Sequence, residues 1–128
     1  MSWAWSDAWV LTAAYVAARN PVSLSDVVAA GDFINHAIFT DEELEHAFTR
    51  LTAAGLVELQ GDVVVLSDEA LALCREAVER AGGVLTATAN VDRALREIQL
   101  GELTPIAIAP GILDAAIERY VDGQAPPV

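Results

Sequence analysis

Apolar residues recur at intervals of three and four through most of this chain, which is the spacing of amphipathic helices. The clearest case follows Thr40, where Leu44, Phe48 and Leu51 fall on one face. Thr40 is a favourable N-terminal cap, acidic residues fill the first turn, and Gly55 suits the left-handed conformation that ends many helices. The pattern therefore predicts a helix between Thr40 and Gly55.

The N-terminal segment predicts a helix over residues 5–19, capped by Ser2 or Ser6 and stopped by Asn20 and Pro21. The stop follows because the residue before a proline is pushed out of the helical region. This helix is apolar on every side, and such helices are buried on every side. We expect it to be covered either by the C-terminal segment or by a second copy of the chain.

Two further helices are predicted from a cap and an apolar stripe. Ser23 caps one that continues to Ile34 and is followed by a turn over residues 36–39. Ser67 caps another, which ends at the glycine pair 82–83. The pattern therefore predicts four helices in the first two thirds of the chain.

A short hairpin is predicted between the third and fourth helices. Residues 56–59 and 63–66 are rich in valine and leucine, and they flank Gly61, where a tight reversal requires positive φ. The fold class is therefore mainly α with a small β-hairpin.

The last part of the chain has a weaker pattern. Residues 84–89 suit either a short strand or a loop, and Asn90 then caps a helix that Gly101 ends. Residues 103–109 suit an extended or irregular segment, and Pro110 starts a final helix. We therefore expect two helices after the glycine pair.

The order of these elements, three helices, a hairpin and a helix, resembles that of a winged helix. Segment 40–59, TDEELEHAFTRLTAAGLVEL, resembles a recurring pattern of that superfamily, in which a helix ends in leucine and Gly-Leu-Val leads into the wing. Segment 64–70, VVLSDEA, resembles the return strand of the wing running into the next helix. By pattern, the chain is similar to the MarR-like and PadR-like transcriptional regulators.

This resemblance covers roughly residues 5–80 and leaves the last 48 residues unmatched. It implies a winged helix over the matched residues, and the pattern of the unmatched part adds two C-terminal helices. We expect a single domain over residues 1–128, with the winged-helix core at 5–80 and a C-terminal helical extension at 84–128.

In DNA-binding winged helices the third helix enters the major groove, and this implies that His46, Thr49 and Arg50 would face DNA here. The charge argues against that use. The chain has seven arginines, no lysine and 19 carboxylates, a net charge of −12. Non-specific affinity for DNA comes from neutralising phosphates. We therefore expect DNA not to be the partner, although a general bias of composition would explain the acidity equally well.

Aromatic residues gather near the start of the chain, and they form the candidate interaction surface: Trp3, Trp5, Trp9 and Tyr15. Tryptophan is enriched at interfaces because it buries a large area and keeps a polar group. The alternative is packing in the core. We favour the core for Trp9 and an interface for Trp3 and Trp5.

Candidate chemistry is sparse. Asp32 with His36, and Glu42 with His46, are carboxylate–imidazole pairs at a spacing of four residues, which could supply metal ligands. Such pairs arise by chance in an acidic chain, and we expect ordinary surface pairing. There is no phosphate-binding loop or nucleophile motif. We therefore expect no enzyme activity, no metal and no cofactor.

The sequence also predicts a cellular environment. The run 8–18 is too short to span a bilayer and lacks the basic flank of a secretory signal. Cys74, the one cysteine, lies on the apolar side of its helix and is expected to be buried and reduced. We expect a cytoplasmic protein without a membrane partner.

Three hypotheses on function remain. The first is a non-enzymatic winged-helix module that acts through protein–protein contacts, as a homodimer built on the first and last helices or with another protein. The second is a DNA-binding transcriptional regulator of the winged-helix type. The third is a module that responds to a small molecule or a metal, with a pocket between the winged helix and the tail.

Overall fold

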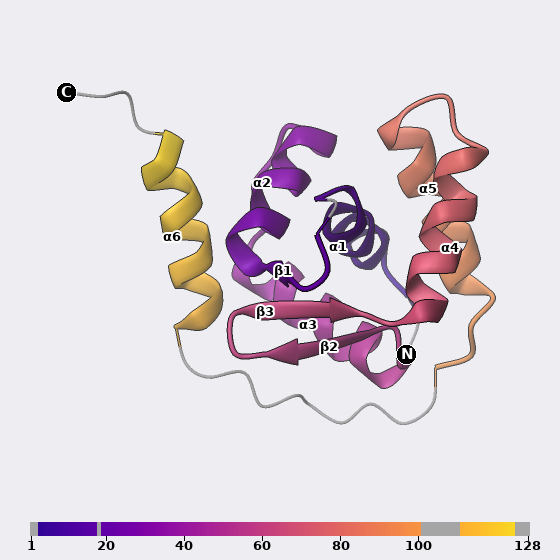
Figure 1. Ribbon diagram of the computed structural model, residues 1–128, viewed down its shortest axis with the longest axis horizontal. Helices are drawn as coiled ribbons and strands as arrows, with labels where there is room; N and C mark the ends of the chain where they lie inside the picture. The colour runs from indigo at the N-terminus through magenta and orange to yellow at the C-terminus, as the bar shows by residue number, and fades with distance from the viewer. Residues whose placement is uncertain (1–2, 18, 101–110, 125–128) are drawn as a thin grey trace.

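The computed structural model describes residues 3–17, 19–100 and 111–124, and these contain six helices and three short strands (Figure 1). The elements in chain order are α1 (Trp5–Val16), β1 (Val22–Ser23), α2 (Leu24–Asn35), α3 (Asp41–Ala53), β2 (Val57–Gln60), β3 (Val63–Leu66), α4 (Asp68–Glu79), α5 (Val84–Arg96) and α6 (Ile112–Gln124). The mainly helical class with a small β element is therefore confirmed.

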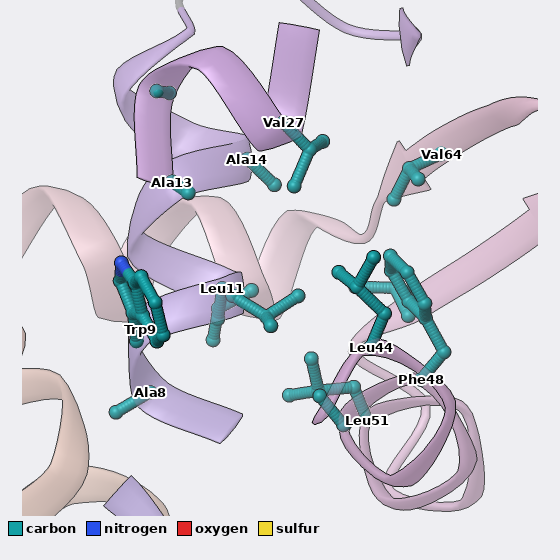
Figure 2. Close-up of a cluster of buried hydrophobic side chains, with 14 of the residues drawn as sticks. Ala8, Trp9, Leu11, Ala13, Ala14, Val27, Leu44, Phe48, Leu51 and Val64 are labelled. Carbon is teal, nitrogen blue, oxygen red and sulfur yellow. The ribbon is translucent and has the colours of Figure 1, made fainter. Parts of the chain in front are cut away.

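Helix α1 is the centre of the fold. Its residues 7–14 are all buried, because α2, α3, α4 and α5 pack around it. Figure 2 shows Leu11 of α1 pointing toward Leu44 and Phe48 of α3. The indole Nε1 of Trp9 donates a hydrogen bond to the carbonyl oxygen of Gly31 in α2, at 2.9 Å. The apolar surface of α1 is thus covered within one chain, by the C-terminal segment among others, and needs no second copy.

The predicted caps of α2, α3 and α4 are present. Thr40 Oγ1 accepts from the Glu43 amide while the Glu43 carboxylate accepts from the Thr40 amide, a complete capping box. Ser23 and Ser67 each accept from the amide three residues on. Gly55 has φ +74°, as its predicted role at the end of α3 requires.

The predicted ends of α1 need correction. Ser6 lies inside the helix, and the residue before the helix is Ala4, whose amide donates to the Asp7 carboxylate at 2.8 Å. The helix ends at Val16 rather than at residue 19. Ala17 follows as the C-cap, and its amide donates to the carbonyl oxygen of Ala13.

The hairpin is confirmed, and it belongs to a three-stranded antiparallel sheet in the order β1-β3-β2. Gly61 has φ +62° at the reversal between β2 and β3. Strand β1, which the sequence did not predict, has two residues and places Val22 opposite Val64. It joins the hairpin to the start of α2.

The prediction for residues 84–89 is wrong. These residues form the first turns of α5, which begins directly after Gly83. Asn90 lies within α5 and donates to the carbonyl oxygen of Ala77 in α4 at 3.1 Å, so it is not a cap. Val91 and Leu95 of α5 are buried, and packing against α1 and α4 decides the local conformation.

Helix α6 packs against α2 and α3, on the opposite side of α2 from α1 (Figure 1). Its buried residues include Leu113 and Ala116. The hydroxyl of Tyr120 lies 2.5 Å from Oδ2 of Asp32 in α2. The predictions for residues 101–110, including the Pro110 start, fall outside the described residues.

Candidate interaction surfaces

The outer face of α3 carries the residues that would face DNA in a DNA-binding winged helix. His46 is exposed, along with Glu42 and Glu45 on the same helix. Thr49 is half-buried, and its hydroxyl donates to the Glu45 carbonyl oxygen at 2.8 Å. The side chains that reach solvent on this face are therefore mostly carboxylates.

The Arg50 side chain is instead largely buried and pairs with an interior residue. Its Nη1 lies 3.3 Å from Oδ1 of Asp7, which is fully buried in α1, and the Arg50 side chain is only 17% exposed. Its Nε is buried and has no hydrogen-bond partner among the described residues. Burial raises the pKa of Asp7 above its usual range, and the hydrogen bond from Ala4 and the charge of Arg50 oppose this rise.

The aromatic cluster is divided between core and surface. Trp3 is 6% exposed, and its indole donates to the Ile98 carbonyl oxygen beyond the end of α5. Trp9 is in the core, with its ring centroid 4.0 Å from that of Phe39. Trp5 is 38% exposed, and Tyr15 is half-buried against the core. Of the three tryptophans, only Trp5 presents a substantial surface to solvent.

A different aromatic residue is the most exposed large hydrophobic side chain in the described part of the chain. Phe33 in α2 is 66% exposed. Phe33 follows Ala29 by four residues and Asp26 by seven, so these three residues share one face of α2. We call Asp26, Ala29 and Phe33, with Ala30 at their edge, the α2 stripe.

The α2 stripe borders an open groove of about 390 Å³. Val16 and Ala17, at the end of α1, form the other wall, and Arg19 lies at its rim. Arg19 Nη1 is 3.9 Å from Asp26 Oδ2, a long contact between two exposed side chains. Sequence reasoning did not identify this surface, although Asp26, Ala29 and Phe33 recur at helical spacing on the side of α2 away from its core. Ala30, which also lines the groove, is buried and belongs to the core.

A second groove, of about 340 Å³, lies along the contact between α4 and α5. Arg80 and Arg93 lie on its walls, but so do Glu76 and Glu97. Arg80 pairs with Glu76 at 2.8 Å. The charges of these walls balance, so the groove has no preference for an anion or a cation.

A third groove, of about 270 Å³, lies beneath α6, between the start of α2 and the tip of the hairpin. Leu24, Ile112 and Ala116 supply its apolar walls, and Asp62 and Arg119 supply its charges. None of the three grooves described here has tryptophan in its walls.

The carboxylate–imidazole pairs do not form a larger cluster. His36 is the left-handed residue after α2, with φ 52°, and Asp32 bonds to Tyr120. In the described residues, no three histidine, cysteine or acidic side chains are grouped so as to hold a metal ion. Cys74 is buried in α4, and burial raises the pKa of its thiol to about 12.

Comparisons with protein-family models, with curated proteins and with solved structures find no match to this chain. Among the described residues, none of the helices has both the length and the apolar character needed to cross a membrane.

Proposed function

We propose that this chain is a non-enzymatic winged-helix module that acts by binding protein rather than double-stranded DNA. The connection of its parts supports the winged-helix assignment. Helices α2 and α3 both pack against α1, and the β2–β3 hairpin follows α3 directly. Strand β1, between α1 and α2, pairs with β3 and so attaches the hairpin to the helices.

The observation that carries the proposal is that Arg50 pairs with a buried carboxylate. It is the one basic residue of α3 apart from His46, and its charge is used inside the molecule, on Asp7. Duplex DNA presents about one negative charge per 1.7 Å of its axis. A duplex on the outer face of α3 would meet Glu42 and Glu45 without a compensating arginine. Protein surfaces impose no such requirement for positive charge.

The test is a fluorescence-anisotropy titration with duplex DNA from upstream of the gene and with a scrambled duplex. Measurements at about 50 and about 200 mM salt are informative because phosphate contacts weaken steeply over this interval. The proposal expects no binding of either duplex at the lower salt. Salt-sensitive binding that prefers the native duplex would overturn it and favour a transcriptional regulator.

A variant with reversed charge provides the positive control. In Glu42→Arg/Glu45→Arg, two exposed carboxylates of α3 become cations without any change in the core. If charge on this face excludes DNA, this variant should bind both duplexes weakly, and the binding should disappear at the higher salt. A matched variant, Glu76→Arg/Glu79→Arg on α4, tests whether a similar change elsewhere has the same effect.

A further inference from the structure

We propose that α6 is a releasable element of the fold: it separates from α2 and α3 while the other helices stay packed, its release uncovers an apolar face of α2, and like charges across the interface favour this release. The change takes place within one chain, so it is independent of the partner in the proposed function. Three features of the α6 interface support the proposal: the few side chains that α6 buries, an unfilled space, and the charges that face one another.

Helix α6 lies at the edge of the molecule and buries few side chains. Among residues 112–123, only Leu113 and Ala116 are buried. In α1, by contrast, residues 7–14 are all buried. Helix α6 packs against α2 and α3, and Figure 1 shows it beside α2 and away from α4 and α5. Separation of α6 therefore leaves the packing around α1 in place.

The interface of α6 also contains unfilled space. The groove of about 270 Å³ beneath α6 has Leu24 of α2 in one wall, and Ile112 and Ala116 of α6 in the other. Protein interiors are close-packed, and side chains that line an open space lose the dispersion contacts of a filled interface. The docking of α6 is therefore weaker than that of a well-packed helix.

Carboxylates face one another where α6 meets α3. Asp114 of α6 lies beside Asp41 at the start of α3, and Glu42 and Glu45 add to the negative charge around Asp41. Desolvation, together with these neighbours, raises the pKa of Asp41 above 3.8 while α6 is docked. The docked state therefore holds a proton on Asp41 more tightly than the released state, and docking weakens as the pH rises through this window.

Two polar contacts favour the docked position. The Tyr120 hydroxyl lies 2.5 Å from Oδ2 of Asp32 in α2. Near the tip of the hairpin, Arg119 Nη1 lies 3.8 Å from Oδ2 of Asp62, and both of these side chains are exposed. Exposed ion pairs contribute little to stability. The contact of Tyr120 thus defines where α6 docks, while the small apolar interface limits how firmly it docks.

The release of α6 changes one face of α2. Leu24, Val28 and Asp32 are spaced four residues apart and share this face. It lies beneath α6, because Leu24 lines the groove there and Asp32 contacts Tyr120. Leu24 and Val28 are both buried when α6 is docked. Separation of α6 gives solvent and partners access to this apolar face.

The first experiment is hydrogen exchange of the backbone amides of the full chain, at urea concentrations well below unfolding. An isolated helix of 13 residues is marginal in water, so the amides of α6 exchange once it is released. They should exchange at least about a hundredfold faster than the core amides of α1. Their rates should also depend less on urea, because release exposes less surface than global unfolding. Equal protection and equal urea dependence in α1 and α6 would overturn the proposal.

A core variant tests whether α6 opens separately. Val91 is fully buried in α5, which packs on α1 and α4. Val91→Ala destabilises the docked and the released states alike, relative to the unfolded chain. The amides of α1 should therefore exchange about tenfold faster or more, while those of α6 keep the wild-type rate. Equal acceleration of both helices would show that α6 opens only by global unfolding, and would overturn the proposal.

A pair of variants in α6 distinguishes release from fraying of a docked helix. Leu113→Ala removes a buried side chain of the interface, and alanine preserves helix propensity. The amides of α6 should then exchange at least about tenfold faster. Val121→Ala, at an exposed valine of the same helix, is the matched control and should not speed exchange. Similar rates in the two variants would contradict release from the interface.

The role of charge is tested on α3, so that the sequence of α6 is unchanged. Asp41→Asn removes one negative charge and keeps a hydrogen-bond donor for Asp114. At about pH 7 the amides of α6 should exchange more slowly, by up to about fivefold, after correction for intrinsic rates. The difference from the wild type should shrink at about pH 4, where Asp41 is partly protonated.

The control for this charge change is Asp68→Asn. Asp68 is the exposed first residue of α4, as Asp41 is of α3. Any loss of interaction with the helix dipole affects the docked and released states alike, so the exchange of α6 should stay at the wild-type rate. Equal slowing in the two variants, or slowing by Asp41→Asn that is the same at both pH values, would overturn the role of like charges in release.

Discussion

The carboxylate of Asp7 and the guanidinium of Arg50 meet inside the protein, 43 positions apart in the sequence, with 3.3 Å between Oδ1 and Nη1. The contact joins the first turn of α1 to the last turn of α3. It also removes from the outer face of α3 the charge that a DNA-binding helix would need. One ion pair therefore links two helices and leaves the outer face of α3 without the charge of Arg50.

Breaking this pair should be costly. Arg50→Met leaves the Asp7 carboxylate buried without its partner, and such losses cost about 3–5 kcal/mol of the free energy of unfolding. Urea denaturation at neutral pH measures the change. Arg75→Met, at an exposed arginine of α4, is the control and should change the free energy by less than about 0.5 kcal/mol. Equal effects in the two variants would show that Arg50 contributes only a surface charge.

The burial of Asp7 predicts that the stability of the protein depends on pH. The pKa of Asp7 is raised in the folded state, chiefly by burial, so between pH 3.8 and that raised pKa the folded protein holds the proton more tightly than the unfolded chain. The contribution of Asp7 to stability therefore falls as the pH rises through this window, and stays low above it. The stability of the wild type relative to Asp7→Asn should be greater at about pH 4 than at about pH 7. A difference that increases with pH would contradict the assignment.

Local chemistry explains what the sequence predicted well. The capping box of Thr40 and Glu43 spans three residues, and Gly55 and Gly61 have the positive φ that their turns require. Such features need no knowledge of the rest of the chain. The caps of α2, α3 and α4, the hairpin and the limits of α3 were therefore accessible from the sequence, whereas the caps of α1 and α5 were not.

Long-range packing explains what the sequence did not predict. Residues 84–89, VLTATA, contain β-branched residues and follow a glycine that provides no side-chain cap, so their local preference is weak. Their helix forms because it buries residues such as Val91 against other helices. The position of Arg50 could not be predicted for the same reason. Its side chain is largely buried because it pairs with Asp7, which lies 43 residues away in the sequence. Trp3 is likewise buried through a long-range contact, in which its indole donates a hydrogen bond to the carbonyl oxygen of Ile98.

The close approach of Gly31 and Phe39 leads to another prediction. A Cβ atom added at Gly31 would lie within 3 Å of the Phe39 ring. Gly31→Ala should therefore destabilise the protein by about 1–3 kcal/mol, as overpacking does. Gly82→Ala meets no atom within 4 Å and should be neutral or stabilising by up to about 1 kcal/mol. Thermal unfolding of both variants tests the contact, and Gly31→Ala/Phe39→Leu should recover part of the loss.

Two acidic residues, Asp41 of α3 and Asp114 of α6, lie close together where these helices pack. Desolvation raises the pKa of Asp41, and the charge of Asp114, a hydrogen bond with its carboxyl group, and the charges of Glu45 and Glu42 add to the rise. The negative charge of Asp114 therefore works against ionisation of Asp41. Asp114→Asn should stabilise the protein at pH 7 by less than about 1 kcal/mol, since both groups are close to solvent. The gain should vanish as the pH falls below the raised pKa. Stabilisation that is the same at both pH values would instead indicate an effect on α6 alone.

The thiol of Cys74 provides a probe of opening in the core. Burial in α4 raises its pKa to about 12, so little thiolate exists at neutral pH, and the sulfur has no access to solvent. A thiol reagent such as dithionitrobenzoate should modify the native protein far more slowly than the protein in concentrated urea. Arg50→Met should speed the reaction under native conditions, because a less stable fold opens more often. Rapid modification of the wild type would show that α4 separates readily from α1, and would contradict the buried position of Cys74.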